Sequence, residues 1–223
     1  MAGRDAWDDP RVQAGMATLL EKRRGLLEDG AEPIGWKLAF GTEVAMSTLE
    51  LNGPLVGFLT DRTLIAPGGE CSIDGWAAPK LEPEIAIHLG AGGEGVAGIS
   101  AAIELADADL PMTETETVLA GDIYHRAVVL DRTATPVAAT APLAARIERD
   151  GEEIAATDDA EAAVGKLDDL AAYVSRYLRE FGESTSEGEV IISGSVVGLL
   201  DIASGWRLTN NLLEVGAVEV SIT

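Results

Sequence analysis

Two glutamates one residue apart lie within a run of otherwise apolar residues, KLEPEIAIHLG (residues 80–90). If this run is a β-strand, its side chains alternate, so that Leu81 and Ile85 point to one face and Glu82 and Glu84 to the other. The two carboxylates then lie about 6–7 Å apart, and burying them is costly unless a positive charge lies between them. Hard divalent cations prefer carboxylate oxygens as ligands. The spacing therefore indicates either a metal site or a half-exposed strand whose glutamates face water.

One lysine and a third glutamate could act with this pair. Lys37 lies in an alternating run, and its neighbours on the same face are Gly35, Ala39 and Gly41. These small side chains leave space above the lysine for a ligand, although a lysine at a strand end can also reach solvent. Glu104, in the run AAIELAD, opposes the apolar face of its own segment. It is therefore either a third metal ligand or a solvated side chain.

Several familiar catalytic motifs are absent from the sequence. It contains no Walker A run, no GxGxxG fingerprint at the start of a helix and no CxxC pair. The SGS run at residues 193–195 lacks the GxSxG frame of a nucleophile elbow. With two histidines, His88 and His125, a Ser-His-Asp triad is possible but has no support from spacing. Carboxylates and one lysine are the chemistry that remains.

The formal net charge of −22 restricts the partners of the chain. Nucleic acids and anionic membrane surfaces both bind through Lys and Arg side chains, so we expect neither as a partner. A single cysteine, Cys71, excludes an internal disulfide framework and is typical of a reducing compartment. The N-terminal residues lack the pattern of a signal peptide, and no long apolar run is present. The sequence therefore predicts a cytoplasmic protein.

Hydrophobic periodicity predicts both helices and strands. Residues 10–27 and 158–182 show the period of amphipathic helices, and a glycine closes the second. Shorter apolar runs bounded by glycine predict strands, with a hairpin turn at Asp150-Gly151 and a final hairpin over residues 206–223. This mixture predicts an α+β fold with a mainly antiparallel or mixed β core and peripheral helices.

Two runs position the candidate residues. The run that contains Lys37 alternates, and the face opposite the lysine is predicted to carry Ile34, Trp36, Leu38 and Phe40. Residues 95–110, which contain Glu104, fit either a strand or a helix. We expect a single domain over residues 1–223, with a helical N-terminal segment (1–34) and a catalytic core (35–223).

A series of motifs resembles a known enzyme family. The elements are GxK at residues 35–37, followed in order by GPLVGFLTDR, PKLEPEIAIHLG, AAIELAD, GEVIISGSVVG and GWRLTNNLLEVGAVEVSI. They resemble the 2-keto-4-pentenoate hydratase and 4-oxalocrotonate decarboxylase family, with similar spacing from Gly35 to the C-terminus. The resemblance implies a fumarylacetoacetate hydrolase-like fold, which is a mixed β-sheet roll with peripheral helices. We also expect a homo-oligomer.

The resemblance also implies roles for particular residues. A divalent cation, Mg²⁺ or Mn²⁺, would be bound by Glu82, Glu84 and Glu104. A small 2-oxo acid would chelate that ion, and Lys37 would act as an electrostatic partner or proton shuttle. The segment that approaches the substrate carboxylate corresponds to Ser193, Gly194 and Ser195.

One departure from the family pattern affects the predicted reaction. Many hydratases of the family have an acidic residue in a PD[YF]G segment, where this chain has Leu55. Asp61 and His125 are the candidates to replace that group. The sequence therefore predicts a divalent-metal-dependent lyase of the hydratase type, acting on a small 2-oxo acid or its dienol. The alternatives are a decarboxylase or C–C hydrolase on the same site, or a non-catalytic relative that serves as a ligand-binding subunit.

Overall fold

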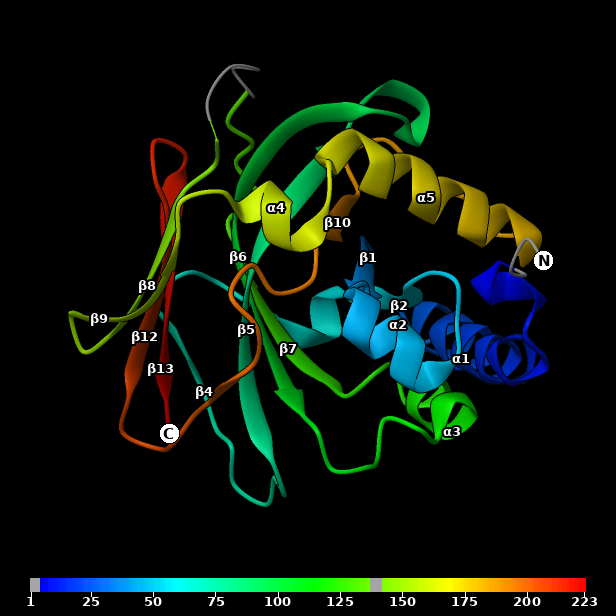
Figure 1. Cartoon of the computed structure of the whole chain (residues 1–223), viewed down its shortest axis with the longest axis horizontal. Coiled ribbons are helices and arrows are strands. Elements are labelled where there is room, and N and C mark those ends of the chain that lie inside the picture. Colours follow the sequence, from blue (N-terminus) through cyan, green and yellow to red (C-terminus); the bar gives the residue numbers. More distant parts are fainter. Residues whose placement is uncertain (1–4, 137–141) are drawn as a thin grey trace.

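A computed structural model describes residues 5–136 and 142–223, so that the first four residues of the predicted N-terminal segment lie outside it. Two β-sheets stand side by side, with the second sheet on one flank of the central strands and most helices on the other (Figure 1). The predicted α+β class is confirmed. The helices are α1 (Pro10–Glu28), α2 (Glu43–Leu49), α3 (Thr115–Ala120), α4 (Ala160–Val164) and α5 (Leu167–Glu180), with 3₁₀ turns at Ala6–Asp8, Asp61–Thr63 and Ala91–Gly93.

The first sheet has the strand order β2-β1-β10-β5-β6-β7-β3, and a short strand, β11, pairs with β5. Its strands are β1 (Pro33–Ala39), β2 (Leu55–Thr60), β3 (Leu64–Ile65), β5 (Pro79–Leu89), β6 (Val96–Asp107), β7 (His125–Leu130), β10 (Val190–Ile192) and β11 (Leu200–Asp201). The long central pair, β5 and β6, is antiparallel and places Glu82 directly opposite Glu104. The run around Glu104 is therefore a strand, because partners on both sides satisfy its backbone hydrogen bonds.

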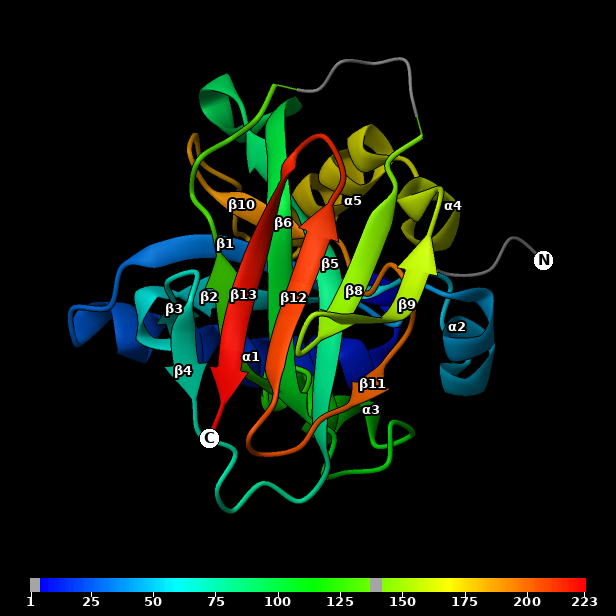
Figure 2. The ribbon, with the colours of Figure 1, turned by 90° about the vertical axis from the view of Figure 1, so that its left-hand side faces the viewer.

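The second sheet has the order β4-β13-β12-β8-β9. Its strands are β4 (Gly69–Cys71), β8 (Ala145–Arg149), β9 (Glu152–Thr157), β12 (Arg207–Leu212) and β13 (Gly216–Ile222). Both predicted hairpins are confirmed, and the first turns at Asp150 and Gly151. Figure 2 shows this sheet in front of β5 and β6, where the side chain of Asn210 donates to the carbonyl oxygens of Glu84 (3.0 Å) and Ala102 (2.8 Å).

The two faces of the first sheet pack against different surroundings. One face joins the large core, together with α1, α5 and the second sheet. The other face forms a small apolar cluster to which all seven strands of the main path contribute, with Ile34, Leu59, Leu64, Ala86, Ala102, Val128, Leu130, Val190 and Ile192. Side chains from seven strands can meet in one small cluster only if the sheet curls around them. The first sheet is therefore a roll with an inner face.

Two sequence predictions about local structure were wrong. Residues 158–182 form two helices rather than one, because Gly165 adopts a left-handed φ of 104° that ends α4. The side chain of Glu161 then accepts a hydrogen bond from the backbone N–H of Leu167 (3.1 Å), where α5 begins. The N-terminal helix, in contrast, begins at Pro10 as predicted and ends at Glu28.

The second error concerns the faces of β1. A bulge between Pro33 and Gly35 turns Ile34 to the inner face, while Trp36 and Leu38 remain in the large core. Phe40 lies beyond the end of the strand. In the part of the chain that the structure describes, no helix is long and apolar enough to cross a membrane.

Candidate metal centre

Three glutamates share the inner face of the roll. Glu82 and Glu104 are register partners across β5 and β6, and Glu84 lies two residues from Glu82 on the same face. Glu84 is 0% exposed and Glu104 1%, while Glu82 is partly buried and lines a cavity. These glutamates are therefore not the solvated side chains of a half-exposed strand. Within residues 5–136 and 142–223, no three acidic, His or Cys side chains are already arranged around a common metal position.

Glu104 is held by two donors. The ammonium of Lys37 donates to Glu104 Oε1 and to the backbone oxygen of Ile123 (3.0 Å), and the lysine is 1% exposed. His125 Nδ1 lies 2.8 Å from the same Glu104 oxygen, and Nε2 lies 2.9 Å from the hydroxyl of Thr63. Because an ionised carboxylate only accepts, Nδ1 carries the proton in this arrangement.

Lys37 and the carboxylates around it shift one another's pKa values. Burial alone would lower the pKa of Lys37, but the carboxylates of Glu104, Glu82 and Asp122 raise it above its usual value. Burial would likewise raise the pKa of Glu104, yet Lys37 and His125 hold it below its usual value. Lys37 and Glu104 therefore form a buried ion pair.

The other two glutamates lack such compensation. Burial and the charges of Glu104 and Glu82 raise the pKa of Glu84 well above its usual value, and burial and Glu104 raise the pKa of Glu82 to about 7. Glu84 Oε2 accepts from the N–H of Gly194 (2.7 Å), but the buried Oε1 has no hydrogen-bond partner in the part of the chain that the structure describes. An unpartnered buried oxygen among carboxylates that repel one another is a donor set that fits a hard divalent cation.

The SGS segment positions Glu84. The hydroxyl of Ser193 accepts from the N–H of Ile85 (3.1 Å) and donates to the carbonyl of Gly194 (2.9 Å). Gly194 has a φ of 84°, a conformation that favours glycine, and from it the N–H reaches Glu84. Ser193, Gly194 and Ser195 all line one cavity of about 470 Å³ together with Glu82. Two of the three predicted substrate-binding residues thus already hold β5 and its glutamate in place.

Two other positions singled out in the sequence differ in their surroundings. Asp61 is exposed in the 3₁₀ turn after β2, where its Oδ1 accepts from the N–H of Glu32 (2.9 Å). No described contact joins it to Lys37 or the glutamates, so the structure does not bring Asp61 to the centre. Leu55 is fully buried on β2, where it pairs with Ala39 and packs in the large core. It provides no proton-transfer group there.

A buried acid that no pattern in the sequence indicated, Asp122, lies near Lys37. Asp122 Oδ1 accepts from the N–H of Phe58 (3.0 Å), and burial raises its pKa to about 6. Gly57 makes this approach possible, because a Cβ there would lie 2.5 Å from Asp122 Oδ1 and 2.9 Å from Cγ of Lys37. The sequence gives no periodic signal for Asp122.

The segment that carries Asp122 is strained. Asp122, Ile123 and Tyr124 have φ angles of 67°, 51° and 65°, which is rare for residues other than glycine. Strain of this kind tends to occur at functional sites. Here it directs the carbonyl of Ile123 to Lys37 and places Ile123 and Tyr124 in the cavity wall.

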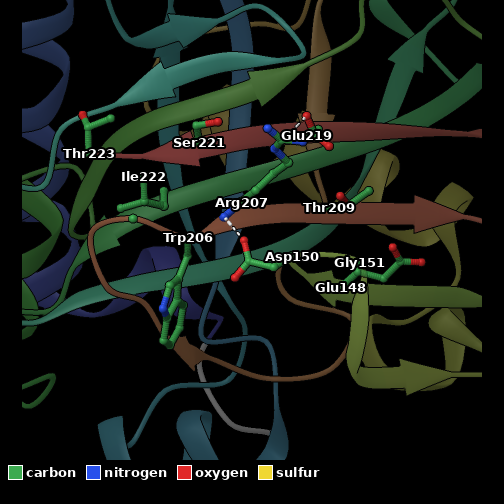
Figure 3. Close-up of a pocket in the computed structure, with 11 residues that line it drawn as sticks. Glu148, Asp150, Gly151, Trp206, Arg207, Thr209, Glu219, Ser221, Ile222 and Thr223 are labelled. Atoms are coloured by element: carbon green, nitrogen blue, oxygen red, sulfur yellow. Dashed lines mark hydrogen bonds and ion pairs between the residues drawn. The ribbon is translucent and has the colours of Figure 1, made fainter.

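A second hollow, of about 550 Å³, lies on the second sheet and is not part of this centre (Figure 3). Three of its charged residues interact: Asp150 Oδ1 accepts from the N–H of Arg207 (3.0 Å), and the Arg207 guanidinium lies 3.7 Å from Glu219. None of the predicted site residues lines it. Although it is larger than the cavity beside Glu82, it contains none of the carboxylates that surround Lys37.

The curled mixed sheet with peripheral helices defines the class of fold, which is fumarylacetoacetate hydrolase-like. No protein-family model matches the chain. A curated relative, the 4-oxalocrotonate decarboxylase of a Pseudomonas species, is 22% identical over 210 residues, which cover 88% of this chain and 81% of the relative.

Two solved structures show the same fold. The 4-oxalocrotonate decarboxylase of Pseudomonas putida G7, complexed with magnesium and adipate, has a TM-score of 0.82 at 21% identity, covering 92% of this chain and 83% of its own. Fumarylpyruvate hydrolase of Pseudomonas aeruginosa, in complex with Mn²⁺ and pyruvate, has a TM-score of 0.66 at 15% identity, covering 84% and 88%. The predicted fold and the resemblance to the hydratase and decarboxylase family are confirmed, the latter through its decarboxylase members.

Proposed function

We propose that this protein is a divalent-metal-dependent lyase that acts on a small 2-oxo acid. The observation that carries the proposal is the inner-face carboxylate cluster, in which a buried oxygen of Glu84 has no hydrogen-bond partner among the described residues while the ammonium of Lys37 pairs with Glu104. The names of similar proteins support it, since they include a decarboxylase complexed with magnesium and a hydrolase in complex with Mn²⁺ and pyruvate.

The metal would be Mg²⁺ or Mn²⁺, and the residues that would hold it are Glu82, Glu84 and Glu104. Three carboxylates favour hard divalent ions over softer ones. Once bound, the ion would supply a Lewis acid that polarises the 2-keto group of the substrate. Ser193 and Gly194 serve this set by fixing Glu84.

Lys37 is the residue to which we assign the main catalytic role. Its ammonium is kept protonated by the surrounding carboxylates, so it can offset the negative charge that develops on a 2-oxo acid as a bond next to the carbonyl breaks. It can also deliver a proton to the neighbouring carbon. His125 has a positioning role. Its Nδ1 contacts Glu104 Oε1, and its Nε2 contacts the hydroxyl of Thr63, so the ring joins the two side chains.

Decarboxylation is the reaction that we favour over hydration. Adding water to a dienol needs a group that handles the proton of water, and the buried Leu55 cannot be that group. The curated relative is a decarboxylase, and so is the one of the two solved structures named above that covers more of this chain. Hydration, with His125 in the role of the missing acid, and C–C hydrolysis are the alternatives on the same site.

A panel of 2-oxo acids, each with and without Mg²⁺, tests the proposal. CO₂ release measures decarboxylation, and the ultraviolet absorbance of the dienol measures hydration or ketonisation. We expect Mg²⁺-dependent CO₂ release from at least one member of the panel. Binding without any turnover would instead favour the non-catalytic ligand-binding subunit, and no Mg²⁺-dependent binding at all would overturn the proposal.

We also propose that the protein is a cytoplasmic homo-oligomer. The support is the resemblance to the family, the single cysteine and the strongly negative charge. Light scattering of the purified protein tests the assembly, and the mass of one chain would contradict it.

A further inference from the structure

Two acceptors fix the direction of the Lys37 ammonium. An ammonium has three N–H donors, and among the described residues Glu104 Oε1 and the backbone oxygen of Ile123 (3.0 Å) accept two of them. Because the donors are arranged tetrahedrally, two fixed acceptors also fix the direction of the third donor. Without one acceptor the ammonium could turn, and a reacting group misplaced by about 1 Å can lose about 10²-fold in rate. The orientation of Lys37 therefore depends on where the carbonyl of Ile123 is held.

The left-handed segment that carries this carbonyl is attached to two elements. Its backbone is tied to α3, since the N–H of Asp122 donates to the carbonyl of Leu119 (3.0 Å) and the N–H of Ile123 donates to that of Val118 (2.8 Å). A side chain attaches it to β2, because Asp122 Oδ1 accepts from the N–H of Phe58 (3.0 Å). Since β2 pairs with β1, the side chain of Asp122 links the segment to the strand next to the lysine.

Gly57 makes room for this link. It is the register partner of Lys37 across β1 and β2, and it directly precedes Phe58. A Cβ at Gly57 would collide with both the carboxylate of Asp122 and the stem of Lys37. Glycine weakens the interior of a strand and often marks a position where another group approaches closely. The missing side chain thus lets the carboxylate reach β2 beside the lysine.

We infer that Asp122 is a positioning residue for Lys37, whose hydrogen bond to Phe58 fixes the segment that presents the Ile123 carbonyl to the ammonium. The effect on turnover rests on the proposed function, whereas the positioning of the lysine does not. Asp122 is 3% exposed and is not among the residues that line the cavity. No described hydrogen bond joins it to Glu82, Glu84 or Glu104. It therefore acts through Lys37 and not on the substrate.

Two substitutions of Asp122 separate the hydrogen bond from the charge. Asp122→Gly removes the acceptor, and it should fold because glycine suits the φ of 67° at this position. We expect kcat to fall about 10–100-fold, with KM within about threefold of the parent, because the substrate contacts are unchanged. Asp122→Asn removes the charge but keeps an oxygen acceptor, and should retain at least about a third of the parental kcat. Steady-state kinetics with the 2-oxo acid that the parent turns over measures both.

A pair of glycine substitutions tests the same link from β2. In Gly57→Ala the added Cβ displaces the carboxylate of Asp122 from Phe58, so this variant should lose turnover as Asp122→Gly does. Gly25→Ala is the matched control, because Gly25 is exposed in α1 and the added Cβ meets open space there. Its kcat should equal that of the parent.

Chemical labelling of lysines follows the position of Lys37 without any turnover. Acetic anhydride modifies amines, and mass spectrometry of the peptides gives the rate at each lysine. Lys37 is 1% exposed, and Lys80, whose side chain is 26% exposed, serves as the internal reference. Asp122→Gly and Gly57→Ala should raise the rate at Lys37 relative to Lys80 about 10-fold or more, the usual effect of losing a hydrogen bond to a charged group. In Asp122→Asn and Gly25→Ala the ratio should stay near that of the parent, and circular dichroism confirms folding.

The outcomes separate this inference from the proposed function. Parental kcat and an unchanged labelling ratio in Asp122→Gly would overturn the inference and leave the function standing. Equal losses in Asp122→Gly and Asp122→Asn would also overturn it, because the charge of Asp122, which faces Lys37, His125 and Lys22, would then be what matters. If the parent turns over no 2-oxo acid, the proposed function fails, and the labelling ratio alone decides whether Asp122 positions Lys37.

Discussion

Two lysine–carboxylate pairs lie at the first sheet in different surroundings. Lys37 pairs with Glu104 inside the roll, where each side chain is 1% exposed. Lys80, on β5, pairs with Asp201 of β11, and their side chains are 26% and 87% exposed. Both pairs join an ammonium to a carboxylate, but they differ in access to water, and Glu104 also interacts with His125.

Water decides what each pair contributes. An exposed pair is screened and typically contributes at most about 1 kcal/mol to stability. Removing one partner of a buried pair leaves an uncompensated charge, which costs roughly 3–5 kcal/mol. In a chain with 38 acidic and 16 basic residues, we therefore expect the buried Lys37–Glu104 pair to matter more than the exposed Lys80–Asp201 pair. The predictions below test this contrast.

The largest effect is expected for Lys37→Ala. The ammonium faces the carboxylate cluster, so its loss should slow turnover of a 2-oxo acid about 10²–10⁴-fold. Lys37→Arg should not restore activity, because a guanidinium is larger and does not give up its proton. Steady-state kinetics, with circular dichroism to confirm folding, measures both variants.

Lys80→Ala is the matched control at the exposed pair. We expect turnover within about twofold of the parent and a small change in stability. Near-parental turnover of Lys37→Ala, or equal losses in the two variants, would remove the distinction between the pairs.

The second prediction concerns metal binding. Mg²⁺ at about 100 times its Kd should stabilise the parent by roughly 2.7 kcal/mol, or raise Tm by roughly 5–10 °C. Glu84→Gln should abolish most of this rise, because it removes the charge of a buried candidate ligand. Thermal denaturation with and without Mg²⁺ measures both, and Asp201→Asn serves as the exposed control. Equal responses of Glu84→Gln and the parent would mean that Mg²⁺ binds the acidic surface in general.

The third prediction concerns pH and the buried acid Asp122. The pKa of Asp122 is about 6 in the folded protein, whereas the ordinary value of an aspartate is 3.8. The folded protein therefore binds this proton more tightly than the unfolded chain does. The stability contributed by the protonated form is complete below about pH 4 and is lost as pH rises through about 6. Asp122→Asn removes that loss, since its amide oxygen can still accept from Phe58.

Urea denaturation at pH 4.5 and pH 7.5, without metal, measures this effect. Between pH 4.5 and pH 7.5, the free energy of unfolding of Asp122→Asn should rise by roughly 1–2 kcal/mol relative to that of the parent, given about 1.4 kcal/mol per pKa unit. Lys37 and His125 lie near Asp122 and lower its pKa, so they limit the gain. A difference between variant and parent that does not change with pH would contradict the prediction.

The smallest effect is expected for Asp61→Asn. Asp61 is exposed, and its carboxylate accepts a hydrogen bond from the backbone N–H of Glu32. The side-chain oxygen of an asparagine can accept the same hydrogen bond. Turnover should stay within about twofold of the parent, whereas His125→Gln in the same assay should reduce it. A large loss in Asp61→Asn would show that this residue acts on the substrate in a conformation other than the one described.

Much of the candidate centre could be predicted because it depends on local geometry. Side chains alternate along any extended strand, so Glu82 and Glu84 had to share a face of β5, and the same rule applied to Glu104 once its run formed a strand. The ends of α1 and both hairpins likewise follow from residues close in sequence. The family resemblance added the suggestion that these carboxylates act together.

The tertiary structure alone decided which groups meet. Lys37 and Glu104 are 67 residues apart in sequence, and they pair because β1 and β6 belong to one sheet that curls. Asp122 joins them through a left-handed segment with no periodic signal, and the curl gives the glutamates an inner face. Alternation is a property of each strand's own backbone, which the sequence determines. Register, curl and charge pairing depend on contacts between distant strands, and these exist only once the whole sheet has formed.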